Sequence, residues 1–346
     1  MSPSAPRFAR SVLVCLIPTG GRAKKSLKPN TRSSTRVALL LVDGIKNAGG
    51  PVTPLLVPDN VEKEGGYRAP LLVISASRRT DIIAWYSAWL VKAINKGEVV
   101  IPHPFTFKPY VVSLKPEQVH TFVLWSKDFS PLIKNLYGVR DALSIYDQLY
   151  FHFTITGLGA TPLEPKVPPW QETIKQLPEL LKIAGHPLRV TLRFDPLIFW
   201  EEAGEIKSNV PLAEPIFIAA AEAGITTVRF SFATLYGKVK KRRWKWIDPP
   251  PEQKLEIASR LVEMGKSMGL TLYSCADPLL LKAGALPSSC IDGRLLSLLH
   301  PRGFPAPTEK DGGQRKECGC SSSVDIGSYL MKCPSGCVYC YANPII

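Results

Sequence analysis

Five of the eight cysteines lie within 23 residues, 318–340, close to the C-terminal end of this sequence of 346 residues. Three of them, Cys333, Cys337 and Cys340, have the spacing C-x3-C-x2-C within CPSGCVYC. Three thiolates this close together can each bind one iron of a [4Fe-4S] cluster and leave the fourth iron without a protein ligand. A free iron of this kind is a place where a cofactor or substrate binds.

Cys318 and Cys320, in the tripeptide CGC, are the other two cysteines of this stretch. If one of them binds the fourth iron, the cluster is closed and serves as an electron carrier or a structural element; if neither does, the cluster is open. Zinc is the alternative, because four of these cysteines would complete a closed tetrahedral site. The x3 and x2 spacings, with Tyr339 just before the last cysteine, favour the iron-sulfur cluster.

The spacing and the aromatic residue resemble the signature of radical S-adenosylmethionine enzymes, and CPSGCVYCYAN is similar to the loop of the spore photoproduct lyase branch. The resemblance implies that the free iron chelates S-adenosylmethionine and that an electron from the cluster cleaves its sulfonium to give a deoxyadenosyl radical. It also implies an electron donor such as a ferredoxin or flavodoxin. Such enzymes carry the loop after the first strand of a (β/α)6 partial barrel, whereas here only six residues follow Cys340. A circularly permuted relative is therefore expected.

About four fifths of the chain, from Pro70 to the end, resembles an uncharacterised prokaryotic family known only as a domain of unknown function. Its C-terminal cysteines are similar to the cluster of the radical enzymes. The resemblance rests on the stretches ISASRRTDI, SLKPEQV, RFDP and SCIDG, on CGC followed by DIGSY, and on CPSGCVYCYAN. Membership of that family implies no particular reaction.

The elements that would position the cysteines alternate regularly. Six runs rich in β-branched and aromatic residues predict strands at 71–76, 120–125, 150–156, 189–194, 227–232 and 271–276. Amphipathic stretches between them predict helices at 82–97, 131–148, 169–185, 211–224 and 250–269. This alternation predicts parallel βαβ units in an α/β fold, a (β/α)6-like partial or closed TIM-type barrel with a C-terminal cysteine-rich cluster loop. An open doubly wound sheet is the alternative.

Polar residues follow several of these strands. In a barrel, the carboxyl ends of the strands form the face that carries the active site, so these residues are expected to meet there. Arg78, Arg79 and Asp81 follow the first strand, and the two guanidiniums are candidates to bind a carboxylate or phosphate. In this interpretation Thr80 or Asp81 caps the next helix. The alternative is a helix cap with exposed arginines. Arg193 and Asp195 share one face of a strand and are candidates for a salt-linked pair that orients substrate.

Two further cysteines are Cys275, near the end of the last predicted strand, and Cys290, which follows that strand. They are candidates to meet at the same face as hydrogen-atom donors or extra ligands. For Cys275 the preferred interpretation is a buried, inert side chain.

The segment KVKKRRWKW, 238–246, has six basic residues and two tryptophans in nine positions. Basic residues interleaved with aromatics suit the backbone and bases of a nucleic acid. The alternative is a solvated helix start whose tryptophans pack on the barrel. The first interpretation makes nucleic acid a candidate partner, and its contacts would be Lys238, Lys240, Lys241, Arg242 and Arg243.

The net charge of +14 is unevenly spread, since residues 1–40 carry eight basic residues and no acidic one. Such a run is typical of a solvated, mobile tail. We therefore expect a basic, partly disordered N-terminal extension over 1–69, an α/β barrel over 70–300 and an iron-sulfur segment over 301–346. The sequence has neither a signal-peptide pattern nor an apolar stretch that would span a bilayer. A cytoplasmic protein without membrane contact is expected, and closely spaced thiols there are more often metal ligands or catalytic groups than disulfides.

The sequence as a whole predicts a radical S-adenosylmethionine-like enzyme with an unknown substrate. The alternative is a nucleic-acid-binding protein whose iron-sulfur or zinc site is structural.

Overall fold

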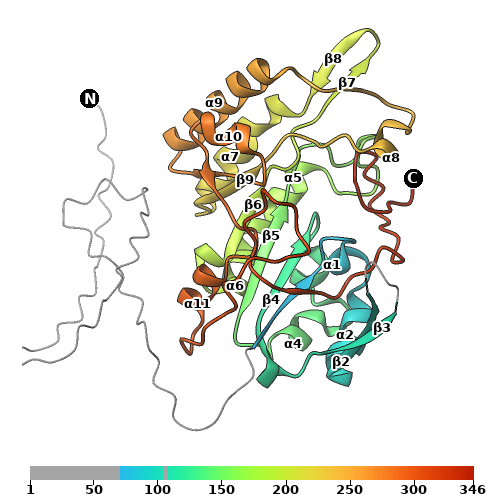
Figure 1. Cartoon of the computed structure of the whole chain (residues 1–346), viewed down its shortest axis with the longest axis vertical. Coiled ribbons are helices and arrows are strands. Elements are labelled where there is room, and N and C mark those ends of the chain that lie inside the picture. The colour runs from blue at the N-terminus through green and yellow to red at the C-terminus, as the bar shows by residue number, and fades with distance from the viewer. Residues whose placement is uncertain (1–70, 104–107) are drawn as a thin grey trace, which may run out of the picture. The chain divides into compact units, whose positions relative to one another are not determined.

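The computed structural model describes residues 71–103 and 108–346 (Figure 1). The predicted N-terminal extension, 1–69, lies outside the described residues. A central sheet of eight strands organises the rest, and every pairing within it is parallel. In sheet order its strands are β12 (Leu286–Pro287), β11 (Thr271–Ser274), β9 (Thr227–Phe230), β6 (Val190–Arg193), β5 (Leu149–Thr154), β4 (Val119–Ser126), β1 (Leu72–Ala76) and β13 (Val324–Asp325).

The six predicted strands are all confirmed as β1, β4, β5, β6, β9 and β11, and they lie side by side in chain order. This order has no reversal of the kind that marks a doubly wound sheet. A closed TIM-type barrel is wrong for this chain. In the described residues the edge strands β12 and β13 pair only with β11 and β1, so the sheet stays open.

Strand β13 comes last in the sequence but lies beside the first strand. Val324 is the register partner of Ile74, and Asp325 that of Ser75. The chain that leaves β13 therefore starts at the carboxyl end of an edge strand next to β1. This pairing brings the C-terminal cysteines to the sheet.

Helices fill the connections between the strands. They are α1 (Ile82–Trp85), α2 (Ser87–Lys96), α3 (Ser130–Ile133), α4 (Val139–Leu143), α5 (Trp170–Thr173), α6 (Leu177–Ala184), α7 (Ala213–Glu222), α8 (Gly237–Lys240), α9 (Pro251–Ser267), α10 (Pro278–Lys282) and α11 (Gly293–Leu299). Helix α2 ends at Gly97, whose φ of 74° is left-handed, as expected for a glycine that stops a helix. The stretch predicted as one helix over 131–148 is broken instead, because Gly138 has a left-handed φ of 75°.

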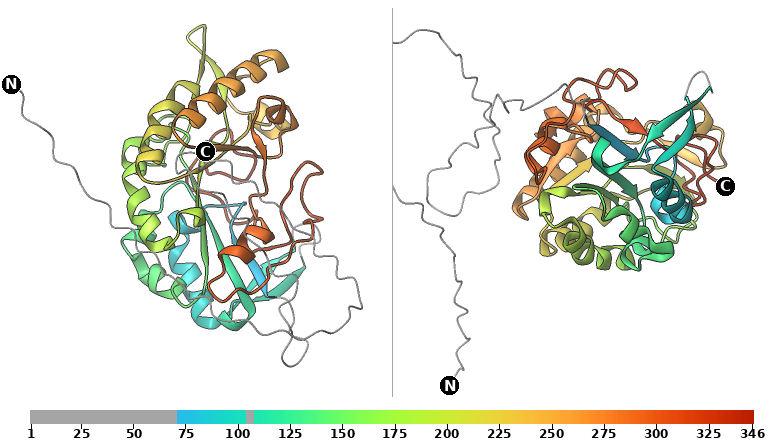
Figure 2. Two further views of the ribbon diagram at one scale, coloured as in Figure 1. Left: turned by 90° about the vertical axis from the view of Figure 1, so that its left-hand side faces the viewer. Right: turned by 90° about the horizontal axis from the view of Figure 1, so that it is seen from below.

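The two faces of the sheet differ in chemistry because side chains alternate along each strand. On one face, apolar side chains such as Phe122, Phe151 and Phe230 form the main core with helices α2, α6, α7 and α9. On the other face, Val123 and Tyr150 pack under α11 and the C-terminal segment. Figure 2 shows these two layers, with the crossover helices on one side and the orange and red C-terminal segment on the other. We call this second side the inner face.

Two smaller antiparallel sheets were not predicted. One pairs β2 (Glu98–Pro102) with β3 (Pro109–Ser113), and the other has the order β10 (Lys245–Ile247), β7 (Phe199–Glu202) and β8 (Glu205–Ser208). Strand β10 comes from the basic segment, so part of that segment is extended rather than helical. Within the described ranges, no helix combines the length and the apolar character that crossing a membrane requires.

Candidate functional site

The segment Cys333–Cys340, which we call the cluster loop, is held in place by backbone hydrogen bonds. The N–H of Val338 donates to the carbonyl of Leu163 at 3.0 Å, and the N–H of Cys340 donates to the carbonyl of Cys337 at 3.1 Å. Gly336 has a φ of 72°, and a Cβ there would lie 3.0 Å from the ring of Pro165. The turn in CPSGC therefore depends on glycine.

Side chains from helix α1 and the basic segment also hold the cluster loop. The indole N–H of Trp85 donates to the hydroxyl of Ser335 at 2.8 Å. The guanidinium of Arg242 donates to the carbonyls of Val338 at 2.5 Å and Cys340 at 2.8 Å. The loop is thus fixed by parts of the chain that lie far away in sequence.

The three thiols of the cluster loop interact electrostatically. Burial raises the pKa of the Cys337 thiol well above its usual value, and Glu164, Cys340 and Cys333 raise it further. Burial also raises the pKa of Cys340, where Cys333 adds to the rise and Lys127 and Arg242 oppose it. A bound cation favours the ionised form of buried thiols such as these. Cysteines that ligate a metal are bound as thiolates.

A buried network under the cluster loop joins Lys127, Glu164 and Tyr339. Lys127 Nζ lies 2.8 Å from Glu164 Oε1 and 3.1 Å from the hydroxyl of Tyr339, and that hydroxyl also contacts Glu164. Thr156 donates to the same carboxylate oxygen at 2.6 Å. The sequence predicted no role for Lys127 or Glu164, because nothing local links them to the cysteines.

Among the described residues, no three side chains of histidine, cysteine, aspartate or glutamate are arranged to hold one metal ion. A cubane cluster differs from a single ion, since each of its thiolates binds a separate iron. Its ligands therefore do not have to meet at one point. Three nearby soft thiols on a fixed loop fit an iron-sulfur cluster in donor chemistry.

Cys318 and Cys320 do not join the cluster loop in this structure. They pack on the inner face with Cys275 and Cys290, and we call these four side chains the thiol group. Cys337 and Cys340 belong to a different packing cluster that includes Leu158 and Trp200. The structure therefore separates the seven described cysteines into two sets, in which Cys333 goes with the loop.

Within the thiol group, Cys275 Sγ lies 3.6 Å from Cys290 Sγ, so the two cysteines meet as the sequence suggested. Arg193 Nη1 donates to Cys290 Sγ at 3.2 Å, and the N–H of Ile291 donates to Cys320 Sγ at 3.4 Å. Hydrogen bonds with Cys275 and Cys320, together with the charge of Arg193, lower the pKa of the Cys290 thiol well below its usual value.

Arg193 and Asp195 form the expected ion pair. Their side chains are 13% and 12% exposed, and Asp195 also accepts a hydrogen bond from Ser231. The Arg193 guanidinium stands over the ring of Trp125 at 5.2 Å. The pair thus lies beside the thiol group on the inner face.

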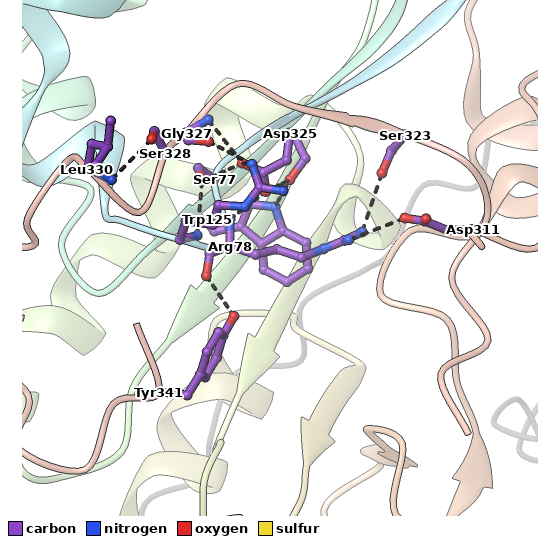
Figure 3. A network of polar contacts seen from close by, with 12 residues as sticks. Ser77, Arg78, Trp125, Asp311, Ser323, Asp325, Gly327, Ser328, Leu330 and Tyr341 are labelled. Atoms are coloured by element: carbon purple, nitrogen blue, oxygen red, sulfur yellow. Dashed lines mark hydrogen bonds and ion pairs between the residues drawn. The ribbon is translucent and has the colours of Figure 1, made fainter. Parts of the chain in front are cut away.

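Arg78 and Arg79 bind the chain's own C-terminal segment. Figure 3 shows Arg78 beside Asp311. Arg78 Nη1 lies 3.6 Å from a carboxylate oxygen of Asp311. Arg79 Nη1 donates to the carbonyl of Gly327 at 2.8 Å and lies 3.9 Å from Asp325. In this structure both guanidiniums are engaged by protein groups, and a ligand would have to share or replace these contacts.

Asp325, at the end of β13, is the centre of the network in Figure 3. Its carboxylate accepts hydrogen bonds from Ser77 Oγ at 2.6 Å, from Ser75 Oγ at 3.1 Å, and from the N–H groups of Arg78 at 2.9 Å and Gly327 at 3.0 Å. Sequence reasoning gave it no role. The only signal was an acidic residue in DIGSY, one of the stretches that carry the family resemblance.

Asp81 is the N-cap of helix α1, as predicted, whereas the exposed arginines of the alternative are wrong, since the side chains of Arg78 and Arg79 are mostly buried. Its carboxylate accepts hydrogen bonds from the N–H groups of Ala84 and Lys127, both at 2.9 Å, and from Ser126. Burial raises its pKa to about 6, although these hydrogen bonds oppose the rise. Asp81 thus fixes the start of α1 against the end of β4.

Two more inner-face residues were missed because each lies within a predicted strand. His152 is fully buried, stacks on Trp125 with ring centroids 4.0 Å apart, and shares a hydrogen bond with the carbonyl of Cys290 at 2.7 Å. Arg229 donates to Thr191 at 2.6 Å and to the carbonyl of Ser289 at 3.0 Å. Alternation along a strand identifies the residues that point away from the helices. Here that face is polar and covered by other parts of the chain, so the pattern alone does not distinguish it from a solvent-exposed face.

The basic segment divides into a buried part and an exposed part. Trp244 and Trp246 stack on each other with centroids 5.8 Å apart and pack beside the cluster loop residues Val338 and Tyr339. Arg242 is occupied with the loop carbonyls. Four of the candidate nucleic-acid contacts are exposed, namely Lys238, Lys240, Lys241 and Arg243.

The family described as a domain of unknown function (DUF1848) matches residues 73–342. A search of curated proteins finds no match. Among solved structures, a crystal structure of D-hydantoinase is 13% identical, with a TM-score of 0.30 over 69% of this chain. The chain spans 45% of the length of that structure. A putative phosphonomutase from Burkholderia cenocepacia J2315 is 10% identical, with a TM-score of 0.29 over 75% of this chain and 87% of its own.

Proposed function

This chain belongs to the DUF1848 family, and from that premise and its geometry we propose that it is a cytoplasmic radical S-adenosylmethionine-like iron-sulfur enzyme. Cys333, Cys337 and Cys340 would hold a [4Fe-4S] cluster with one open iron. When bound, such a cluster supplies an electron to a cofactor chelated at that iron, with a ferredoxin or flavodoxin as the electron source. The family match itself assigns no reaction.

The observation that best supports this proposal is the position of the cluster loop relative to the sheet. Strand β13 precedes β1, β4, β5, β6 and β9 in the order of the sheet, and the loop follows β13 at its carboxyl end. In the enzymes that the cysteine motif resembles, the loop follows the first strand of a partial barrel. A permuted partial barrel, with β13 as its first strand, accounts for a loop that follows β13 rather than β1.

The surroundings of the loop also support an open cluster rather than a four-cysteine site. Cys318 and Cys320 pack with Cys290, away from the cluster loop. We therefore propose three protein ligands. Lys127 and Arg242 provide positive charge beside the thiolates, and such charges favour the ionised form that binds iron.

The substrate would bind near the same edge of the sheet. Arg78, Arg79, Arg193 and Asp195 remain candidates to orient it, and Tyr341 ties the cluster loop to this group by donating to the carbonyl of Arg78 at 2.7 Å. A carboxylate or phosphate of the substrate would compete with Asp311 for Arg78, since that contact is long at 3.6 Å.

Anaerobic purification with analysis of iron, sulfide and zinc tests this function. We expect about four irons per chain, their loss in Cys337→Ala, and 5′-deoxyadenosine after reduction by dithionite with S-adenosylmethionine. Cys318→Ala and Cys320→Ala should keep the iron, which separates a three-ligand cluster from a closed one. Iron without cleavage of the cofactor would refute the enzyme and leave an electron carrier, whereas zinc alone would refute both.

A second candidate, nucleic-acid binding, is favoured by the four exposed cations Lys238, Lys240, Lys241 and Arg243. With Trp244 and Trp246 packed together, contact would be to phosphates rather than to bases. Binding of a single-stranded DNA should weaken steeply with salt and in a variant with these four residues changed to glutamine. DNA binding that does not depend on salt, or that is as strong in the variant as in the wild type, would contradict this second function.

A further inference from the structure

The thiol group brings four cysteines together from three separate parts of the chain. Cys275 follows β11, Cys290 lies before α11, and Cys318 and Cys320 lie in the segment that leads to β13. Cys290 and Cys320 are 8% and 2% exposed, whereas Cys275 and Cys318 are partly exposed. All seven described cysteines are free thiols.

Two of these thiols are in contact. Cys275 Sγ and Cys290 Sγ are 3.6 Å apart, which is van der Waals contact, so a small movement of either side chain would bring the two sulfur atoms to bonding distance. Cys320 Sγ also hydrogen-bonds to Cys290 and accepts from the N–H of Ile291 at 3.4 Å. Cys275 and Cys290 are the two thiols that Arg193 contacts, and we take them as the pair.

A cation faces this pair from the sheet. Arg193 Nη1 donates to Cys290 Sγ at 3.2 Å, and Nη2 lies 4.0 Å from Cys275 Sγ. A guanidinium beside a cysteine favours the thiolate, which is the form that attacks disulfides. A buried, inert cysteine needs no such partner.

We propose that Cys275 and Cys290 form a dithiol–disulfide redox site, which takes low-molecular-weight disulfides such as glutathione disulfide as oxidants. Intracellular disulfides are most often of this transient, catalytic or redox-sensing kind. The site is distinct from the cluster loop and does not depend on the proposed function.

The exchange balances in two steps. The Cys290 thiolate beside Arg193 attacks one sulfur of glutathione disulfide, which forms a mixed disulfide and releases one glutathione thiolate that takes the proton of Cys275. The Cys275 thiolate then attacks the Cys290 sulfur, which expels the second glutathione as a thiolate that takes a proton from water. Two protein thiols are oxidised, and one glutathione disulfide is reduced to two thiols.

Oxidation would also change the environment of Arg193. A disulfide carries no negative charge, so the Arg193 guanidinium would lose the Cys290 thiolate as an acceptor. It would keep its ion pair with Asp195. The redox site would in this way alter an arginine on the inner face.

The test is a thiol count and disulfide mapping by mass spectrometry on the full chain, equilibrated in glutathione buffers of rising oxidised fraction. We expect two thiols fewer in the oxidised protein, a peptide pair that joins Cys275 to Cys290, and full reversal by dithiothreitol. Cys275→Ser and Cys290→Ser should each abolish this pair, and Cys15→Ser, which removes the remaining cysteine of the sequence, should leave it unchanged.

Three results would overturn the proposal. They are a disulfide that maps to Cys318 and Cys320 instead, no change in thiol count across the buffers, and a metal that is lost on changing Cys275 or Cys290 to serine. The same titration in Cys337→Ala separates this site from the cluster loop. The two-thiol change should persist there whether or not the wild-type protein binds iron.

Discussion

Lys127 and Glu164 form an ion pair beneath the cluster loop, with Nζ and Oε1 2.8 Å apart and side chains that are 16% and 1% exposed. Burial alone would lower the pKa of Lys127, but Glu164 and then the thiols of Cys337 and Cys340 raise it above the usual value. The pair links the end of β4 to the loop through the hydroxyl of Tyr339. One lysine thus neutralises a buried carboxylate and faces two cysteines.

Lys127→Met should destabilise the protein by about 3–5 kcal/mol, because it leaves the Glu164 carboxylate buried without its cation. The double variant Lys127→Met with Glu164→Gln should recover a large part of that loss, since it removes both charges. Urea unfolding of the three proteins measures the effect. Changing Lys96, whose pair with Glu98 is 66% and 42% exposed, should alter the stability by less than about 1 kcal/mol. Equal losses in the single and double variants would contradict this account.

Arg242→Ala should loosen the cluster loop, because two carbonyls, those of Val338 and Cys340, lose their charged donor. Hydrogen bonds of this kind contribute about 1.5–3 kcal/mol. Hydrogen exchange of the amides at 338–340 should become faster. If the loop holds a cluster, a chelator should also remove iron several times faster.

The neighbouring Arg243 provides the matched control, since it has the same charge but is exposed. Arg243→Ala should leave exchange in the loop unchanged. Equal exchange in the two variants would mean that Arg242 does not hold the loop. The comparison also separates loop anchoring from any contribution of these arginines to binding of nucleic acid.

Asp325→Asn should release the C-terminal segment from the sheet. Each carboxylate oxygen of Asp325 accepts two of the four hydrogen bonds from Ser75, Ser77, Arg78 and Gly327. An amide NH2 in place of either oxygen places a donor opposite two donors, which should cost about 2–3 kcal/mol. Limited proteolysis should then cleave earlier within 320–346. Asp311→Asn, which loses only the 3.6 Å contact with Arg78, should change the pattern little.

The strands of the main sheet were predictable because each repeats a local pattern. In TVRFSF and YFHFTIT, aromatic and β-branched residues alternate with polar ones, and the apolar set packs on the helices. The polar residues of the same strands could also be recognised, but their role depends on which part of the chain covers the inner face. His152 and Arg229 acquire partners only when α11 and the segment before it fold over them.

The candidate site could be predicted only in part, because some of its features are local in sequence and others depend on long-range packing. The spacing of Cys333, Cys337 and Cys340 is local, so the sequence identifies them as a set. The separation of Cys318 from the loop is not local, since it depends on packing beside Cys290. Likewise the pairing of β13 with β1 joins residues 250 positions apart, such as Ser75 and Asp325, and a strand of two residues has no periodicity to detect.

A pair of buried histidines near α11 predicts how stability depends on pH. His300 lies against His120 with ring centroids 4.4 Å apart and ring planes tilted by 43°, and it is 4% exposed. Burial, and then the neighbouring His120, lowers the pKa of His300 from 6.5 to about 4, although Asp147 opposes the change. Between these two pH values the unfolded chain binds a proton that the folded protein does not.

Stability should therefore fall as the pH is lowered from 6.5 to 4, because the contribution of neutral His300 is complete above its unfolded pKa and is lost below it. His300→Gln removes this proton, so its free energy of unfolding should fall by about 2 kcal/mol less than that of the wild type over the same interval. Urea titrations at several pH values measure the slope, and His186→Gln on the surface controls for removal of a histidine. Parallel slopes for the wild type and His300→Gln would show that the proton is taken up elsewhere.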